Sequence, residues 1–230
     1  VGSYIALACL TIMPAIFLNF YKNSKITNKN NSTYSNVRTY KEFVSDPKFL
    51  QAMVAATFGY VVMAFLMTAT PISMHYVHKL SVDKVGLVIQ FHVLGMFLPS
   101  LFTGNLIKRF GFSNIMYTGV FFYALTISLS LFEPTFINYF ASLIFLGIGW
   151  NFLYISGTSL LVTTYNEQEK FKAQGFNDLI VFSATAIGSL SAGILISLLS
   201  WKIVNFMCIP FLIIILFVIL RADIKKAPAN

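Results

Sequence analysis

The sequence predicts an all-α, polytopic membrane protein, and three observations support this fold class. Seven apolar stretches are long enough to cross a bilayer, which takes roughly 20 apolar residues for ~30 Å of hydrocarbon. Hydrophobic residues make up 57% of the 230 residues and charged residues only 10%, with a mean hydropathy of +0.75. Of the 16 Lys and Arg residues, 13 fall on one side of the predicted spans.

The seven predicted spans contain no Lys, Arg or Glu, and Asp178 is the one acidic residue within them. They cover residues 3–20, 50–74, 85–107, 114–132, 136–164, 173–199 and 203–220. Because the bilayer core holds no water, the backbone there must satisfy its own hydrogen bonds as helix or closed barrel. Barrel strands alternate polar and apolar residues over about 10 residues. The chain lacks that pattern, so the spans are predicted to be helices.

The basic residues indicate how the spans are oriented. One side of the spans carries Lys22, Lys25, Lys29, Arg38, Lys41, Lys48, Lys108, Arg109, Lys170, Lys172, Arg221, Lys225 and Lys226, and the other carries Lys79, Lys84 and Lys202. Cytoplasmic loops collect Lys and Arg, so the first side, which includes the C-terminus, is predicted to be cytoplasmic. The same rule accounts for the net charge of +8 without a nucleic-acid partner.

The spans divide the chain into four parts. Residues 1–20 are a leading transmembrane helix, 21–49 a cytoplasmic linker, 50–220 a block of six closely connected helices, and 221–230 a cytoplasmic tail. The chain begins at Val1, without Met, directly before an apolar segment. We therefore expect it to be the later part of a longer membrane protein.

The linker and the two cysteines carry smaller predictions. The polar run 28–33 is typical of a flexible segment, and Asp46-Pro47 suits the cap and first turn of the next helix. Cys9 and Cys208 lie in different apolar spans, so neither a disulfide nor a metal site is expected. No cofactor is expected either.

The connection after the third span carries the most specific motif of the chain. Residues 104–111 read Gly-Asn-Leu-Ile-Lys-Arg-Phe-Gly, the pattern G-x-L-x-x-R-x-G. Gly104 is expected to permit close helix packing, and Gly111 to end the helix. At a cytoplasmic helix end, the Arg109 guanidinium is suited to meet the negative end of the helix dipole or a lipid phosphate.

With a long basic loop followed by six helices and this motif between the second and third of them, the chain resembles the C-terminal half of a major facilitator superfamily transporter. The resemblance covers essentially the whole chain. The stretches 92–104, 147–152 and 174–178 are similar to those of a poorly characterised bacterial branch of that family.

The resemblance implies a layout and also shows departures. The first span would be helix six of twelve, 21–49 the central loop and 50–220 helices seven to twelve, so an N-terminal half of the same protein would be a partner. The fuller family motif has an acid where Lys108 stands and further basic residues where Phe112 and Ser113 stand.

In this family, helices seven, eight, ten and eleven face the central cavity, so their polar faces are candidates for a transport pathway. In the fifth predicted span, Gly147, Asn151, Tyr154 and Thr158 follow the spacing of one helical stripe. Asn151 is the most informative, since an amide near mid-membrane needs a hydrogen-bonding partner or a ligand. An interhelical hydrogen bond is the alternative for its side chain.

Two other spans contribute weaker candidates. His92 lies in an apolar helix with Gln90 nearby, and an unperturbed histidine titrates near neutrality, so proton coupling or ligand contact stands beside the ordinary structural role of a lone histidine. Tyr60 belongs to a stripe of aromatic and Met residues that is equally typical of packing. His75 and His78, in the connection after the second span, are predicted to be solvated.

Asp178 is a functional candidate because acids within membrane spans are costly. It lies about five residues past the start of its span, or ~8 Å by helical rise, which favours the cytoplasmic interface. It is either a proton-carrying acid or a cytoplasmic gate residue that pairs with Arg109 or with a basic motif of the first half. Gly104 and Gly111 belong to the same expected gate.

The resemblance and these residues predict a secondary active transporter in a bacterial inner (cytoplasmic) membrane, working by alternating access. The substrate is expected to be a small organic solute, neutral or weakly charged because the spans hold no dense cluster of charges. H⁺ is the coupling ion that the resemblance implies. Export is slightly favoured over uptake.

The alternative is a seven-helix receptor or another membrane protein without transport activity. A retinal protein needs a Schiff-base Lys in its last helix, and 203–220 has none. An intramembrane enzyme would need paired acids, a Ser/Lys or Ser/His pair, or H-E-x-x-H on helices. The spans hold one isolated Asp and one isolated His, so no enzymatic activity is expected.

Overall fold

A computed structural model describes residues 2–19 and 37–224, and every element within these ranges is a helix. The helices are α1 (Gly2–Asn19), α2 (Tyr40–Ser45), α3 (Pro47–Ile72), the π-helical turn η1 (Ser73–Val77), α4 (Val82–Phe97), α5 (Ser100–Phe110), α6 (Phe112–Leu129), α7 (Phe136–Val162), α8 (Lys170–Leu198), α9 (Trp201–Phe206) and α10 (Ile209–Ile224). The chain divides into two units at Asn36 and Val37, and α1 belongs to the first.

The first unit bears on the predicted leading helix. α1 runs from Gly2 to Asn19, which confirms a helix over residues 3–19 of the predicted segment. Its role as a membrane span stays a prediction. Residues 20–36, which include most of the predicted linker with its polar run, lie outside the described residues, as do residues 225–230 of the predicted tail.

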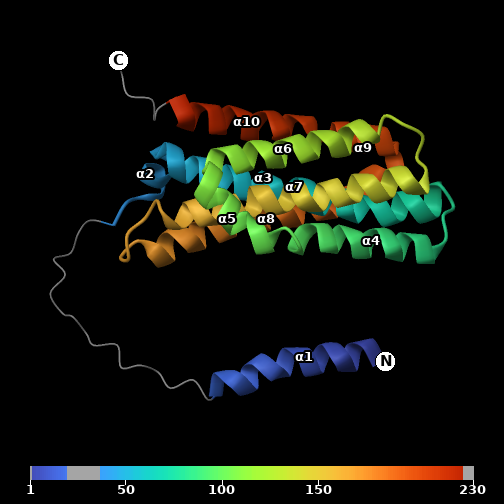
Figure 1. Cartoon of the computed structure of the whole chain (residues 1–230), viewed down its shortest axis with the longest axis horizontal. Helices are drawn as coiled ribbons and strands as arrows, with labels where there is room; N and C mark the ends of the chain where they lie inside the picture. The colour runs from blue at the N-terminus through green and yellow to red at the C-terminus, as the bar shows by residue number, and fades with distance from the viewer. Residues whose placement is uncertain (1, 20–36, 225–230) are drawn as a thin grey trace. The chain divides into compact units, whose positions relative to one another are not determined.

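The second unit is an all-helical bundle (Figure 1). Within residues 37–224, six helical segments have the length and hydropathy needed to cross a membrane. They are Pro47–Val77, Val82–Phe110, Phe112–Leu129, Phe136–Val162, Lys170–Leu198 and Trp201–Ile224. They match the six later predicted spans one for one, with ends shifted by a few residues, and the predicted fold class is confirmed.

Burial is distributed unevenly over these helices. α3 packs against α7, α8 and α10, and 78% of the most apolar window of α3–η1 is buried, compared with 22% for α4–α5 and 17% for α8. α3 and α7 cross closely at Gly157 of α7, because a Cβ at this position would lie 2.8 Å from the Ala52 carbonyl oxygen of α3. α3 is thus the centre of the bundle, whereas α4 and α8 present largely open faces.

The start of α3 is fixed by its first residues. The Asp46 carboxylate accepts hydrogen bonds from the Lys48 and Phe49 backbone N–H groups, at 2.9 Å and 3.5 Å, and Pro47 occupies the first turn. This confirms the predicted cap. α2, just before it, lies within the predicted linker and begins with a reciprocal pair of hydrogen bonds between Thr39 and Glu42, the arrangement known as a capping box.

Two predicted spans are interrupted, which their apolar patterns did not indicate. α4 ends at Phe97 and α5 begins at Ser100, with Pro99 between them. Proline lacks the N–H that would continue the helical ladder and clashes with the preceding turn. A second break separates α9 from α10 just before Pro210. The predicted spans 85–107 and 203–220 are therefore each present as one membrane-spanning segment that is built from two helices with a short break between them.

The two motif glycines behave differently. Gly111 ends α5 with a φ of +83°, a conformation that favours glycine, and its N–H donates to the Ile107 carbonyl at 2.8 Å. Its predicted role as a helix stop is confirmed. A Cβ at Gly104 would meet no atom within 4 Å among the described residues. That face of α5 is exposed in the described part of the chain, so close packing at Gly104 stays a prediction.

The basic residues of the described part gather as predicted at one end of the bundle, where α2 begins and α10 ends (Figure 1); we call it the basic end. They are Arg38, Lys41, Lys48, Lys108, Arg109, Lys170, Lys172 and Arg221. Lys79, Lys84 and Lys202 lie at the opposite end. The assignment of the basic end to the cytoplasm stays a prediction.

Candidate functional site

Five aromatic side chains from four helices meet in a group that we call the aromatic cluster: Tyr60 of α3, Phe97 of α4, Trp150 and Tyr154 of α7, and Phe182 of α8. The Trp150 and Tyr154 rings, one helical turn apart, stack with centroids 5.0 Å apart and planes at 12°. The Tyr60 ring meets these two edge-on at 5.5 Å and 5.2 Å. Stacked and edge-on contacts are the favoured geometries of aromatic pairs.

The side chains of the cluster differ in exposure, and three of its hydrogen-bond donors have no partner in the described part of the chain. Trp150 is 5% exposed, whereas Phe97 and Phe182 are 59% and 54% exposed. The buried Trp150 Nε1–H has no hydrogen-bond partner in the described part of the chain, and neither do the hydroxyls of Tyr60 and Tyr154. A buried donor without a partner is costly and calls for an explanation such as a ligand or a water. The cluster is therefore suited to bind a flat ring that carries acceptor atoms.

Two of the predicted pathway residues, Tyr60 and Tyr154, belong to this cluster. Thr158 lies one turn beyond Tyr154, and its hydroxyl donates to the Tyr154 carbonyl at 2.8 Å within the same helix. Phe97, Trp150 and Phe182 were missed. Trp150 was detectable, since it stands one turn before Tyr154 in a predicted cavity helix.

Asn151 lies at the break between α4 and α5. Its Nδ2 donates to the Met96 carbonyl at 2.6 Å and to the Ser100 Oγ at 2.5 Å, and its Oδ1 accepts from the Thr103 Oγ1 at 2.6 Å. The side chain is fully buried. The geometry corresponds to the interhelical hydrogen bonds that the sequence left open as the alternative, while a contact with substrate stays a prediction.

The two predicted candidates on α4, His92 and Gln90, lie on different faces of the helix. His92 is fully buried, and its Nδ1 lies 2.7 Å from the Leu143 carbonyl oxygen of α7, while its Nε2 has no partner among the described residues. Gln90 is exposed, on a different face of α4. α4 and α7 approach closely beside His92, because a Cβ at Gly147 would lie 2.5 Å from the His92 carbonyl oxygen.

The predicted gate residues at the basic end do not form a pair. The Arg109 guanidinium lies over the neighbouring Phe110 ring, with its carbon 5.2 Å from the ring centroid. Asp178 is exposed and accepts a hydrogen bond from its neighbour Asn177 at 3.1 Å. Neither Arg109 nor Asp178 forms an ion pair within the described ranges.

Ser113, where the fuller family motif has a basic residue, instead joins three helices. Its hydroxyl donates to the Asp223 carboxylate of α10 at 2.7 Å and accepts from the Gln51 Nε2 of α3 at 3.0 Å. The Tyr117 hydroxyl also donates to Asp223, at 3.2 Å. α10 extends to Ile224, so this acid, predicted to lie in the tail, is part of the bundle.

The basic end also holds an ion pair that no sequence pattern indicated, which we call the latch: Arg38 and Glu169. The Arg38 guanidinium binds both oxygens of the Glu169 carboxylate at 2.8 Å, and it also contacts Asp46 and the Thr164 carbonyl. The hydrogen bonds from Arg38 lower the pKa of the nearly buried Glu169 carboxyl to about 2. The latch fastens the segment before α3 to the connection between α7 and α8.

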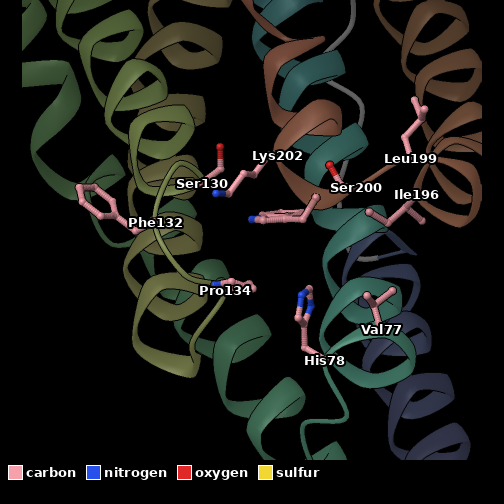
Figure 2. Close-up of a pocket in the computed structure, with 10 residues that line it drawn as sticks. Val77, His78, Ser130, Phe132, Pro134, Ile196, Leu199, Ser200 and Lys202 are labelled. Carbon is pink, nitrogen blue, oxygen red and sulfur yellow. The ribbon is translucent and has the colours of Figure 1, made fainter.

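A pocket of about 170 Å³ lies at the opposite end of the bundle, and Figure 2 shows His78 and Lys202 among its lining residues. The His78 Nδ1 lies 3.1 Å from the Ser73 carbonyl oxygen and 3.0 Å from the Tyr139 hydroxyl. His75 Nδ1 lies 3.0 Å from the Leu80 carbonyl oxygen. The prediction that both histidines are simply solvated is wrong, because the π-helical turn η1 and the residues after it bring backbone carbonyls to the rings.

The fold and the cluster together define a multi-pass α-helical membrane protein with an open, aromatic-lined face. The chain matches the family described as Major Facilitator Superfamily over residues 49–230. The chain belongs to that family, as the motif and the helix layout suggested. The family points to a transporter rather than an enzyme.

The chain is similar in sequence to three bacterial proteins. The chain is 36% identical over 230 residues to the "Riboflavin transporter RfnT" of Brucella anthropi, an alignment that covers 100% of this chain and 58% of the relative. It is 35% identical over 139 residues to the "Uncharacterized MFS-type transporter YdeG" of Bacillus subtilis, covering 60% of this chain and 32% of the relative. The "Uncharacterized MFS-type transporter YddS" of the same species is 31% identical over 148 residues, covering 63% and 34%. The chain thus spans little more than half the length of the first relative.

Proposed function

We propose that the chain forms one wall of a secondary active transporter that moves a small, flat aromatic solute across the membrane by alternating access. The aromatic cluster carries the proposal. Its members come from α3, α4, α7 and α8, which correspond to the four helices expected to face the cavity. α4 and α8 also leave most of their surface uncovered, as suits a wall that closes against a second half of the transporter.

The cluster also supports the class of substrate. Stacking of a flat ring on an aromatic side chain contributes about 1–3 kcal/mol, and the unused hydroxyl donors of Tyr60 and Tyr154 can bind acceptor atoms at the ring edge. Riboflavin, after which the Brucella anthropi relative is named, has a flat three-ring system with carbonyl and ring-nitrogen acceptors. Riboflavin or a chemically similar heterocycle is the substrate that we propose.

Coupling and direction complete the proposal. H⁺ is the proposed coupling ion, with His92 or Asp178 as its carrier, and export is slightly favoured over uptake. The basic end faces the cytoplasm of a bacterium whose inner membrane holds the protein, so the C-terminus is cytoplasmic. Gly104, Arg109, Gly111 and Asp178 are proposed to act at the gate on that side, and an N-terminal half of the same protein completes the cavity.

The test is transport of riboflavin by the complete protein in liposomes, followed by flavin fluorescence with and without a proton gradient. Phe182→Ala removes an exposed ring from the cluster, and Phe217→Ala removes a similarly exposed ring of α10, 62% exposed, that has no aromatic neighbour in the described part. We expect Phe182→Ala to weaken riboflavin binding about tenfold, since a lost ring contact contributes about 1.4 kcal/mol. Phe217→Ala should bind like the wild type.

Two results would contradict the proposal. If the wild-type protein neither binds nor transports riboflavin or another flat heterocycle, the substrate class is wrong. If Phe182→Ala and Phe217→Ala bind riboflavin equally well, the cluster is not the binding wall. A transport rate that does not respond to the proton gradient would remove only the coupling ion from the proposal.

A further inference from the structure

Asp178 lies next to the aromatic cluster on the open face of α8. It stands four residues before Phe182, and side chains four residues apart share one face of a helix. Phe182 contacts Tyr60 with ring centroids 6.1 Å apart, and the Asp178 carboxylate lies within electrostatic range of the Tyr154 hydroxyl. The acid is therefore one helical turn from the cluster, on the side of the basic end.

The Asp178 carboxylate has unused acceptor capacity. A carboxylate offers about four lone-pair sites, and the one hydrogen bond to Asp178 in the described part comes from Asn177 at 3.1 Å. Two basic residues of the basic end are engaged with other partners: Arg38 binds Glu169, and the Lys172 Nζ donates to the Arg38 carbonyl at 2.6 Å. A solute on the cluster thus meets an exposed acceptor with a negative charge.

The combined site has two kinds of partner for a solute. The rings and free donors of the cluster suit a flat heterocycle with acceptor atoms. The Asp178 carboxylate suits a substituent with hydroxyl or ammonium donors, because hydrogen bonds to an ionised acceptor are the stronger ones. A phosphate monoester on the same substituent would place a charge of about −1.5 to −2 beside the carboxylate, which is unfavourable.

We propose that Asp178 is a specificity-determining residue that admits the hydroxyl- or amine-bearing form of a flat aromatic solute and excludes its phosphate monoester. This inference rests on the proposed function and adds the chemical form of the substrate. Two unit charges of like sign about 7 Å apart at an effective dielectric constant of ~20 weaken binding by on the order of 10- to 100-fold, and the larger charge of a phosphate monoester increases this effect. The exclusion should therefore be measurable.

The test compares riboflavin with riboflavin 5′-phosphate on the purified complete protein, by quenching of flavin fluorescence. We expect the wild type to bind riboflavin at least about tenfold more tightly than its phosphate. Asp178→Asn, an isosteric change at an exposed position, should bring the ratio of the two affinities close to one, mainly through tighter binding of the phosphate. Asp178→Glu should keep the discrimination. Glu167→Gln, which neutralises an exposed acid of the α7–α8 connection, should leave the ratio unchanged.

Ionic strength gives a second measurement. Salt screens exposed charges over a Debye length of ~10 Å at 0.1 M, so the wild-type ratio should fall as salt is raised, while that of Asp178→Asn should not. A gate role for Asp178 alone would change both affinities by one factor and leave the ratio unchanged, which would overturn the inference. If the wild type binds neither flavin, riboflavin is excluded as the substrate and this inference fails with it; the proposed substrate class fails only if no other flat heterocycle binds either.

Discussion

Asn151 gives the sharpest test of how the bundle is held together, because its side chain joins both sides of the break in the α4–α5 span. Pro99 interrupts the helical ladder at this break, and Asn151 of α7 binds the Met96 carbonyl on one side and the hydroxyl groups of Ser100 and Thr103 on the other. Replacing Asn151 with Leu keeps the branched shape of the side chain and removes all three hydrogen bonds.

The magnitude follows from the three bonds. Interhelical hydrogen bonds in membrane proteins contribute ~0.6 kcal/mol on average and at most ~1.7 kcal/mol each. Asn151→Leu should therefore lower the free energy of unfolding by about 2 kcal/mol, and by no more than about 5 kcal/mol. The buried Thr103 hydroxyl keeps a second hydrogen bond, to the Pro99 carbonyl at 2.8 Å. Since a polar group that keeps a partner avoids the full cost of an unsatisfied one, the expected value stays in the lower part of this range.

The assay is denaturant-induced unfolding of the purified complete protein in detergent, with Asn114→Leu as a matched control. Asn114 is exposed, and its Nδ2 donates to the Phe110 carbonyl at 2.9 Å within the same stretch of chain, so that change should stay within about 0.5 kcal/mol of the wild type. A double-mutant cycle of Asn151→Leu with Ser100→Ala should show coupling. Equal stability of Asn151→Leu and Asn114→Leu, or additive effects in the cycle, would refute the assignment of Asn151 to the break.

Two further predictions concern the latch and the crossing of α4 with α7. Folding lowers the pKa of Glu169 from its ordinary value of 4.5 to about 2, so its stabilisation is present above pH ~5 and is lost as the pH falls towards 2. Because solvent near the latch screens part of the interaction, Glu169→Gln should cost about 1–2 kcal/mol at pH 7 and less at pH 3 in unfolding experiments; a cost that does not change with pH would contradict this. Gly147→Ala should lower the unfolding temperature through about 1–3 kcal/mol of overpacking, since its Cβ would lie 2.5 Å from the His92 carbonyl oxygen. Gly104→Ala, which meets no atom within 4 Å among the described residues, should not lower it, and equal effects of the two changes would show that the crossing is not tight.

The residues that were predicted well are those whose role is set by their near neighbours in sequence. Asp46-Pro47 and Gly111 act within one turn of their own helix, so their residue types define the cap and the stop. The spans themselves follow from composition over about 20 residues. Helical spacing also places Tyr60 and Tyr154 each on a definite face, and the two rings meet in the aromatic cluster; their part in a transport pathway stays a prediction.

What was missed depends on residues that are far apart in the chain. Arg38 and Glu169 are separated by 131 positions, and each is an ordinary charged residue of a polar loop until the fold brings the two together. The hydrogen-bond partners of Asn151 could not be predicted from the sequence either, because the break at Pro99 had to be known first. Local pattern could show that this amide needs hydrogen bonds, but not which helix supplies them.

α7 connects the two features on which transport would depend. Asn151 binds the break between α4 and α5, and Trp150, the preceding residue, carries the inner ring of the aromatic cluster. Phe97, the last residue of α4 before the break, contacts Trp150 with ring centroids 6.1 Å apart. A solute that inserts between these two rings must therefore displace the end of α4 or turn α7, and either movement strains the hydrogen bonds at Pro99. We therefore expect binding at the cluster to be coupled to bending of the α4–α5 span, and the Asn151→Leu protein to lose that coupling even where it still binds the solute.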